Sequence, residues 1–199
     1  MRIMAIELTD ISKAYGTNVV FDRFNCQIEE GLITCVMGPS GQGKTTLLRL
    51  ILGLEQPDSG HISGISGRRK SVVFQEDRLC ENLSATSNIR LASRRSLKMN
   101  SISDAMSALG LTSDSIKQPV RDMSGGQQRR VAILRALMAE YDILLMDEPF
   151  KGLDKETKEK VIRYTKEHIS GKTVVFVTHD ETECHTMGGN IIHIRGNLL

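Results

Sequence analysis

The sequence predicts an α/β fold in which a mostly parallel sheet forms the core, with an antiparallel β portion near the N-terminus and an inserted helical subdomain. Three observations lead to this prediction. Runs rich in Val, Ile and Leu alternate with segments of helical periodicity, a glycine-rich loop joins one run to a helix, and strand-like runs vanish between about residues 76 and 123. Short apolar strands that are each followed by a helix are typical of a parallel sheet covered on both faces.

The chain is expected to form one domain. Its 199 residues are enough for one well-buried domain with a small subdomain attached. We expect residues 1–75 and 124–199 to form the α/β core, and residues 76–123, where Ser, Asn and Arg become frequent, to form the helical subdomain. The chain ends soon after its last apolar run, so we expect no C-terminal regulatory domain.

The individual elements follow from the hydrophobic pattern and from turn residues. In the first half we expect strands at residues 3–8, 19–28, 32–37, 61–63 and 71–74, a helix at 44–54, and a turn at 57–60. In the second half we expect helical spacing at residues 103–109, helices at 125–139 and 155–169, and buried strands at 143–146 and 173–177.

The composition disfavours a nucleic-acid surface. The formal charge is only +2, aromatic residues make up 4% of the chain, and Trp is absent, which leaves little for base stacking. Cys26, Cys35, Cys80 and Cys184 have no metal-ligand spacing. We therefore expect these cysteines to be small buried hydrophobic residues in a reducing compartment.

No segment predicts export or membrane insertion. The N-terminus contains Glu7 and Asp10 and lacks the continuous apolar stretch of a signal peptide. The longest apolar stretch, residues 47–54, is interrupted by Arg49 and is too short to span a bilayer. We expect a soluble, cytoplasmic chain that reaches a membrane only through a partner.

A glycine-rich loop with the full pattern Gly-x-x-x-x-Gly-Lys-[Ser/Thr] lies between a predicted strand and a predicted helix. Glycines let backbone N–H groups point at phosphate oxygens, and the helix start adds its positive dipole end. Lys44 is expected to bind the β- and γ-phosphates, and the Thr45 hydroxyl to bind Mg²⁺. A chance glycine-rich turn is the alternative. The residues expected to bind ATP here are Gly38, Pro39, Ser40, Gly41, Gln42, Gly43, Lys44, Thr45 and Thr46.

Two acids follow the predicted strand at residues 143–146. Ligands of open α/β sheets bind at the carboxyl ends of strands, so this end is expected to face the glycine-rich loop. Adjacent strand residues point in opposite directions, so the two acids must have different roles. Asp147 suits the Mg²⁺ shell, and Glu148 suits the base that polarises the attacking water. A solvated strand end is the alternative.

Residues 123–130, Met-Ser-Gly-Gly-Gln-Gln-Arg-Arg, come just before that strand. Ser124 alone would be an ordinary helix N-cap. Together with the loop and the acids, these residues resemble the signature motif of ATP-binding cassette (ABC) ATPases, and the resemblance extends over about residues 6–194. It implies the P-loop NTPase fold and hydrolysis of ATP to ADP and phosphate. It also implies that the ATP of a second copy is bound by Ser124, Gly125, Gly126 and Gln127.

Four further residues resemble positions of that family. Tyr15 resembles the aromatic residue that stacks on adenine, although a core or edge tyrosine is the alternative. Gln75 resembles the glutamine that joins the Mg²⁺ and water site, Asp154 lies in a loop like the one that meets the opposite subunit, and His179 resembles the switch histidine at the γ-phosphate. The implied metal ligands are Thr45, Gln75 and Asp147, and the implied catalytic residues are Glu148, His179, Lys44 and Gln75.

The resemblance implies a transporter subunit. The insert before Ser124 is short and has no sustained heptads, unlike DNA-repair and chromosome types, and a single phosphate loop is unlike translation-factor types. Residues 73–79 are similar to those of bacterial importers of the nitrate/sulfonate/taurine group, although residues 80–83 depart from that group's usual Pro-Trp. An exporter engine and a soluble ABC-type ATPase that acts on a protein complex remain alternatives.

The implied partners are a second cassette in a homodimer, a multi-span membrane permease and a substrate-binding protein, with no nucleic acid. The chain would then sit on the inner face of the cell membrane through the permease. Two positions depart from the family pattern. Met123 replaces the usual Leu, a near-isosteric change, and Lys151 replaces a small residue with no role that the sequence assigns.

Overall fold

Two sheets of different kinds form the frame of the protein, and a computed structural model describes residues 5–93, 99–112 and 117–194. The antiparallel sheet has the order β2-β1-β4. The parallel sheet has the order β5-β6-β7-β3-β8. The bounds are Ile6–Tyr15 for β1, Asn18–Ile28 for β2, Ile33–Met37 for β3, Ser59–Ser63 for β4, Lys70–Val73 for β5, Ile143–Asp147 for β6, Thr173–Val177 for β7 and Asn190–His193 for β8.

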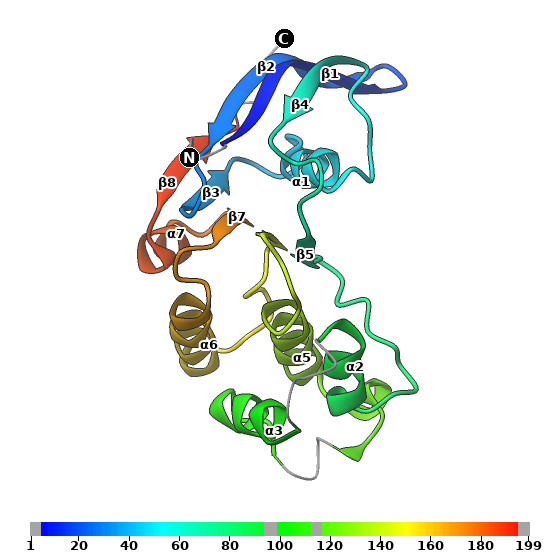
Figure 1. Ribbon diagram of the computed structural model, residues 1–199, viewed down its shortest axis with the longest axis vertical. Coiled ribbons are helices and arrows are strands. Elements are labelled where there is room, and N and C mark those ends of the chain that lie inside the picture. Colours follow the sequence, from blue (N-terminus) through cyan, green and yellow to red (C-terminus); the bar gives the residue numbers. More distant parts are fainter. Residues whose placement is uncertain (1–4, 94–98, 113–116, 195–199) are drawn as a thin grey trace.

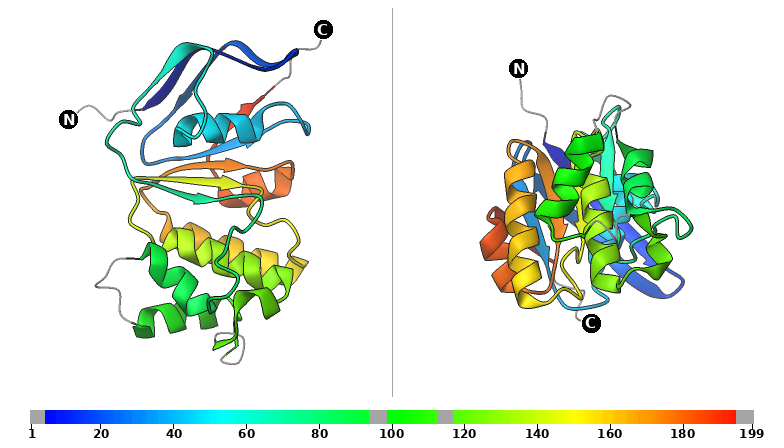
Figure 2. Two further views of the ribbon diagram at one scale, coloured as in Figure 1. Left: turned by 90° about the vertical axis from the view of Figure 1, so that its right-hand side faces the viewer. Right: turned by 90° about the horizontal axis from the view of Figure 1, so that it is seen from below.

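The helices form layers around the parallel sheet. Helix α1 (Lys44–Leu52) lies between the two sheets, whereas α5 (Gly125–Leu137) and α6 (Lys155–His168) cover the opposite face of the parallel sheet (Figure 1). Beyond α5 lie α2 (Ala85–Ala92) and α3 (Met99–Ala108), at the end of the molecule away from the antiparallel sheet (Figure 2). The short helices are η1 (Val120–Asp122) and α7 (Glu181–Met187).

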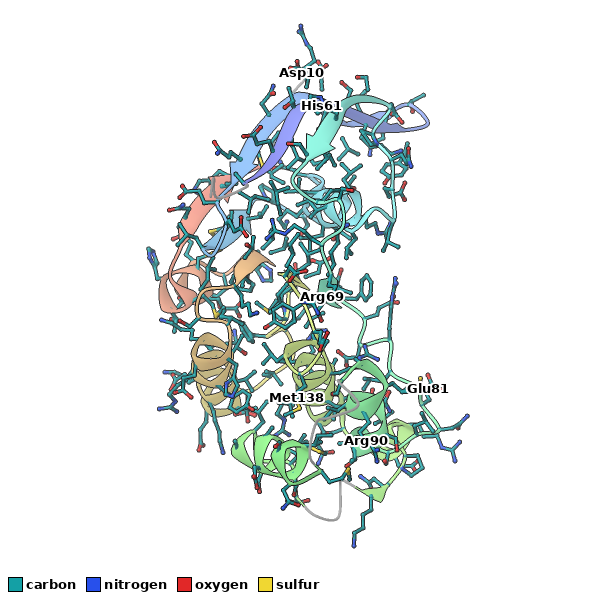
Figure 3. All side chains as sticks on the ribbon, viewed as in Figure 1. Asp10, His61, Arg69, Glu81, Arg90 and Met138 are labelled. Atoms are coloured by element: carbon teal, nitrogen blue, oxygen red, sulfur yellow. A yellow bond between two sulfur atoms is a disulfide. The ribbon has the colours of Figure 1, made fainter. Side chains whose placement is uncertain are left out.

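The two ends of the molecule are easily told apart by their labelled side chains. Asp10 and His61 lie on the antiparallel sheet, and Glu81 and Arg90 lie at the helical end (Figure 3). Helices α2 and α3 fall within residues 76–123, for which a helical subdomain is predicted, and the boundaries of that subdomain remain a prediction. None of the helices within the described residues is long and apolar enough to cross a membrane.

Side-chain alternation along the central strands divides the interior into two cores. In β6, Ile143 and Leu145 pack with α1 and the antiparallel sheet, whereas Leu144 and Met146 pack with α5, α6 and the helical end. Strand β7 alternates in the same way, and all five of its residues are buried. Successive strand residues point to opposite faces, so an apolar run covered on both sides is the signature of a central parallel strand.

The predicted elements agree with the observed ones except at their ends, near the C-terminus and at the helical end, where α2 and η1 have no individually predicted counterpart. The strand predicted at residues 3–8 begins at Ile6 and continues to Tyr15, and residues 3–4 lie outside the described residues. Helix α1 ends at Leu52 because Gly53 adopts a φ of 78° as its C-cap. Helix α7 has no counterpart among the predicted elements, since its sequence ETECHTM contains too few apolar residues to show a helical period.

The cysteines correct one prediction. Cys35 of β3 and Cys184 of α7 are buried as expected but form a disulfide, and the free thiol of Cys80 is exposed, so the expectation is wrong in the first two for the free thiol and in Cys80 for burial. The disulfide joins positions 149 residues apart, so local spacing could not predict it. Burial raises the pKa of the fourth thiol, that of Cys26, to about 11.

Candidate nucleotide site

The glycine-rich loop connects β3 to α1 and is shaped by glycines with positive φ. Gly41 has a φ of 80° and Gly43 a φ of 92°, and a Cβ on Gly43 would lie 2.5 Å from Val20 Cγ1. Lys44 is 7% exposed. Its ammonium donates hydrogen bonds to the carbonyl oxygens of Gly38, at 2.7 Å, and Pro39, at 2.8 Å. The lysine thereby closes the loop into a ring at the start of α1.

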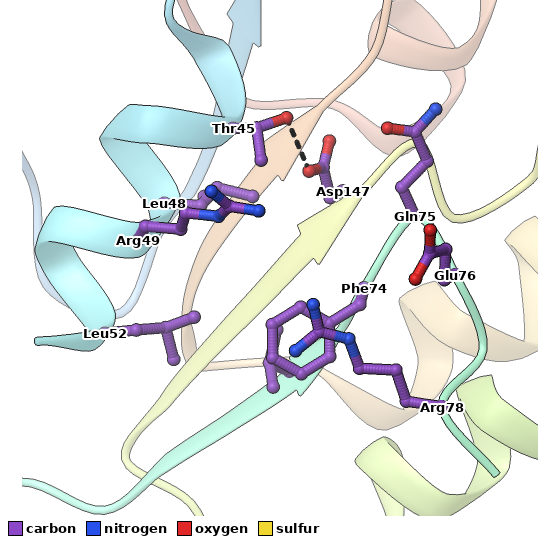
Figure 4. Close-up of a pocket in the computed structure, with 10 residues that line it drawn as sticks. Thr45, Leu48, Arg49, Leu52, Phe74, Gln75, Glu76, Arg78 and Asp147 are labelled. Atoms are coloured by element: carbon purple, nitrogen blue, oxygen red, sulfur yellow. Dashed lines mark hydrogen bonds between the residues drawn. The ribbon is translucent and has the colours of Figure 1, made fainter. Parts of the chain in front are cut away.

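The end of β6 lies against this loop. The Thr45 hydroxyl donates a hydrogen bond of 2.8 Å to Asp147 Oδ2 (Figure 4). The Asp147 side chain is buried, and this burial raises the pKa of its carboxyl above the ordinary value. The nearby Glu148 charge adds to the increase, while the Thr45 hydrogen bond and the cations of Arg129 and Lys44 oppose it.

The backbone turns out of the β6 strand at Glu148, the residue directly after the strand end. Its φ of 44° is in the left-handed region, which is uncommon for a residue with a side chain and often accompanies a functional site. The carboxylate lies between two groups, with Oε1 at 3.3 Å from His179 Nδ1 and Oε2 at 3.3 Å from Lys151 Nζ. Burial raises the pKa of Glu148, but Lys151 and His179 outweigh that effect and hold the pKa below its ordinary value.

A cavity of 350 Å³ lies over these groups, and most of the residues predicted to bind ATP line it. Its walls include Tyr15, Gln75 and Lys151, together with the loop and both acids. Tyr15 lies at the rim and is 42% exposed. The Lys13 ammonium lies over the Tyr15 ring in a cation–π contact, 5.3 Å from the ring centroid. Of the loop residues predicted to bind ATP, this cavity is lined by Ser40, Gly41, Gly43, Lys44, Thr45 and Thr46.

A smaller cavity of 150 Å³ adjoins the Thr45–Asp147 pair (Figure 4). Gln75 lines both cavities, as do Thr45 and Asp147. On the far wall the Arg78 guanidinium lies 3.9 Å from the centroid of the Phe74 ring. Gln75 is therefore placed at the junction between the nucleotide cavity and the segment that leads to the helical end.

The signature residues lie apart from this cavity. Ser124 is the N-cap of α5 in a full capping box, because Gln127 N donates to Ser124 Oγ at 3.3 Å and Ser124 N donates to Gln127 Oε1 at 2.9 Å. Ser124 and Gly125 are exposed, and Gly126 and Gln127 are partly exposed. A single chain therefore does not bring residues 124–127 to the groups that line the 350 Å³ cavity.

The last two predicted residues, Asp154 and His179, lie just before the helices α6 and α7. Asp154 is the exposed N-cap of α6, where its carboxylate accepts a hydrogen bond of 3.0 Å from Thr157 N, and this bond lowers the pKa of Asp154. His179 follows β7 with its side chain 63% exposed. His179 is joined to the site through its contact with Glu148, whereas Asp154 does not line the cavity.

Several residues of the site escape the sequence prediction. Lys151 was noted only as a departure, yet it lines the cavity and pairs with Glu148. Arg129 is buried and hydrogen-bonded to the backbone on both sides of the site. The one available signal for Arg129 is its place in the pair Arg129-Arg130, which ends the stretch at residues 123–130.

The donor set suits a hard divalent cation. It consists of a hydroxyl, a buried carboxylate and a side-chain amide, which are oxygen ligands of the kind that such cations prefer. A cation would also stabilise the ionised form of Asp147, which burial disfavours. Within the described part of the chain, no group of three or more His, Cys, Asp and Glu could hold a metal by itself. Water and the phosphate oxygens of a nucleotide would complete the shell of such a cation.

Comparison with known sequences places this site in a family. The family pattern described as ABC transporter matches residues 21–151. The chain is 38% identical to the spermidine/putrescine import ATP-binding protein PotA of Treponema pallidum, covering 98% of this chain and 56% of that protein. It is 37% identical to the aliphatic sulfonates import ATP-binding protein SsuB 2 of Paraburkholderia xenovorans, covering 98% of this chain and 79% of the relative.

Solved structures agree with these relatives. The dimeric structure of MJ0796, described as a bacterial ABC transporter cassette, superposes with a TM-score of 0.83 at 30% identity and covers 95% of this chain and 94% of that one. The same cassette in a dimeric post-hydrolysis state bound to ADP and Pi also has a TM-score of 0.83, at 29% identity, and covers 96% of this chain and 94% of that one. The predicted fold is thereby confirmed, and the chain belongs to the ABC transporter family of ATP-binding ATPases, with import subunits among its relatives.

Proposed function

We propose that the chain is the ATP-hydrolysing subunit of an ABC importer in which two copies close over two ATP molecules. One observation carries the two-copy proposal. The loop, Asp147 and Glu148 share one cavity, whereas the exposed helix start at Ser124 lies outside it. A helix start with free N–H groups is an anion site, so Ser124 to Gly126 would complete the γ-phosphate site of a facing copy.

Different residues of this chain would have different roles in ATP hydrolysis. Lys44 and the loop N–H groups bind the phosphates and hold them in line with the attacking water. Glu148, kept ionised at neutral pH by its neighbours, accepts the proton of that water as it attacks the γ-phosphorus. His179, 3.3 Å from Glu148, orients the carboxylate and would contact the γ-phosphate. Tyr15 supplies an aromatic face for adenine at the cavity rim.

A Mg²⁺ ion would be held by Thr45 and Asp147, with Gln75 at the same cavity. When bound, it would neutralise charge on the β- and γ-phosphate oxygens. The Thr45–Asp147 hydrogen bond keeps these two oxygen ligands together before nucleotide arrives.

The proposed partners follow from the family. The relatives named import ATP-binding proteins differ in cargo, which is spermidine/putrescine in one name, aliphatic sulfonates in another and sulfate/thiosulfate in a third. We propose a membrane permease, docked beside Gln75 and the helical residues 76–123, which would bring the chain to the cytoplasmic face of the membrane. A substrate-binding protein would deliver the cargo. Asp154 would lie at the interface of the two cassettes.

The test is co-purification. Genes that neighbour the one for this chain are searched for a multi-span permease, which is expressed with the chain in membranes, and the complex is assayed for MgATP hydrolysis and for transport into vesicles. We expect the permease to co-purify with the chain and ATP hydrolysis to rise when cargo is imported. A soluble complex without permease would instead favour the second class, a soluble ABC-type ATPase, and outward transport would favour an exporter engine.

A further inference from the structure

Arg129 is a buried arginine of α5 that the proposed chemistry leaves without a role. It lies five residues after Ser124 and is 4% exposed. Its Nε donates a hydrogen bond of 2.7 Å to the carbonyl of Pro149, and its Nη2 donates to the carbonyls of Asp147, at 3.0 Å, and Glu148, at 2.6 Å. One side chain therefore binds three consecutive carbonyls at the carboxyl end of β6.

The same guanidinium also binds the segment that contains Gln75. Its Nη1 donates to the carbonyl oxygens of Phe74, at 2.6 Å, and Gln75, at 3.3 Å, and pairs with Asp77 Oδ1 at 2.8 Å. Gln75 and Glu148 are 73 positions apart in the sequence (148 − 75), just after the ends of the parallel neighbours β5 and β6. Arg129 thus joins the backbone of Gln75 to that of Glu148.

The chemistry of arginine makes this joint rigid. A guanidinium is planar, stays charged in proteins, and presents its donors in a fixed fork. The carbonyl of Glu148, whose φ of 44° takes the chain out of the strand, accepts one of these bonds. A lysine has three donors at a single point and could not reach acceptors on both segments at once.

We propose that Arg129 is a positioning residue for ATP hydrolysis, which sets Gln75 and Glu148 relative to each other and ties both to the helix that begins at Ser124. The inference rests on the proposed nucleotide site. Among the described residues, the hydrogen-bond partners of Arg129 do not include the loop at residues 38–46, so nucleotide binding and the hydrolytic step can be separated experimentally.

The test compares Arg129→Gln with Arg135→Gln in the full chain. Arg135 is on the same helix and donates to the carbonyls of Asp77 and Arg78, both at 2.9 Å, without a hydrogen bond to the end of β6. Steady-state MgATP hydrolysis is measured at a chain concentration where the rate per chain no longer rises, and ATP affinity by calorimetry.

We expect Arg129→Gln to lower kcat about tenfold to a hundredfold, the size of a small misplacement of catalytic groups, with ATP affinity changed less than about threefold. Arg135→Gln should stay within about twofold of the wild-type kcat. The kcat of Arg129→Lys should remain at least about fivefold below that of wild type, because the charge of an ammonium does not replace the several fixed donors of a guanidinium. Full activity in Arg129→Gln or Arg129→Lys, an equal loss in Arg135→Gln, or a parallel loss of ATP affinity would each overturn the proposal.

Should Arg129→Gln fail to fold, the same two measurements, kcat and ATP affinity, are made on Asp77→Ala instead. Asp77 is 20% exposed at its side chain, and its removal takes away the carboxylate that pairs with the buried guanidinium while the five carbonyl acceptors of Arg129 stay in place. We expect kcat to fall about threefold with unchanged ATP affinity, as for a loosened positioning contact. A wild-type kcat in Asp77→Ala would contradict the role of Arg129. If the wild-type chain itself did not hydrolyse ATP, the proposed function would fail instead, which is a different outcome.

Discussion

The phosphate loop and the signature helix start differ in how complete each is within one chain. At the loop, Lys44 is buried, Thr45 is bonded to Asp147, and a cavity of 350 Å³ lies ready for a ligand. At the helix start, Ser124 and Gly125 face solvent, and the capping box joins the Ser124 N–H and hydroxyl to Gln127 without involving Gly125. The loop is assembled by the core of its own chain, whereas residues 124–127 of the helix start do not line that cavity.

This difference has a physical origin. The loop lies between β3 and α1, and residues of both belong to the core shared by the two sheets, so packing fixes its backbone. The signature belongs to the N-terminal turn of α5, and only the later part of that helix is packed in the second core. Under the proposed function, hydrolysis therefore depends on one preformed half-site and one half-site that a second copy supplies.

The largest expected effect on kcat is that of changing Glu148. This change tests whether the preformed half-site, which contains the phosphate loop, also contains the base. Glu148→Gln should bind ATP normally and lower kcat about a thousandfold, within the range for loss of a general base. It should also accumulate a nucleotide-bound dimer, detected by size-exclusion chromatography with MgATP. Glu156→Gln, an exposed acid in the first turn of α6, is the control. Turnover at the wild-type rate in Glu148→Gln would contradict this assignment.

The next effect tests how tightly packing fixes the loop. Gly43→Ala places a Cβ 2.5 Å from Val20 Cγ1 at a φ of 92°, whereas Gly41→Ala meets nothing within 4 Å at a φ of 80°. We expect Gly43→Ala to lower the free energy of unfolding by about 3 kcal/mol, from strain and overlap together, and Gly41→Ala by about 1 kcal/mol, from strain alone. Urea unfolding measures both. Equal losses would mean that the loop is not held by its surroundings.

Lys44 tests nucleotide binding by the loop alone. Lys44→Ala removes the ammonium and should weaken ATP affinity by about 2 kcal/mol, or roughly thirtyfold, as expected for a charged hydrogen-bonding group. Calorimetry with ATP measures the change, and a thermal melt checks folding. Normal ATP affinity in this variant would count against the loop as the phosphate site.

The smallest effect is expected at Lys151. Its ammonium lies 3.3 Å from Glu148 but its side chain is 58% exposed, and exposed ion pairs contribute little. Lys151 helps to hold the pKa of Glu148 below its ordinary value, so Lys151→Ala should move that pKa upward. Because the base acts when ionised, the acid limb of the pH–kcat profile should shift to higher pH, with kcat at neutral pH within about threefold of wild type. An unshifted acid limb, as in the exposed control Lys155→Ala, would show that the pair does not affect the base.

Much of the fold and of the loop half could be predicted because the relevant signals are local. The loop pattern, the apolar run before Asp147 and the capping residue Ser124 can each be identified from a few consecutive residues. The roles of Arg129 and Lys151 could not be predicted, because each depends on partners in another segment or on a backbone turn at Glu148. The Cys35–Cys184 disulfide and helix α7 escaped for the same reason, since tertiary packing and not sequence periodicity determines them.

The central claim is that one ATP site takes its loop from one copy and its signature from another, and mixing two inactive variants tests it directly. Lys44→Ala lacks the loop lysine, and Ser124→Arg blocks the helix start. Each alone should hydrolyse ATP poorly, because both sites of its dimer are damaged. A mixed dimer has one intact site, so an equal mixture should recover roughly a quarter of the wild-type rate, given random pairing in a two-fold dimer. A mixture no faster than the sum of its parts, or a Ser124→Arg chain that hydrolyses ATP at the wild-type rate alone, would contradict the claim.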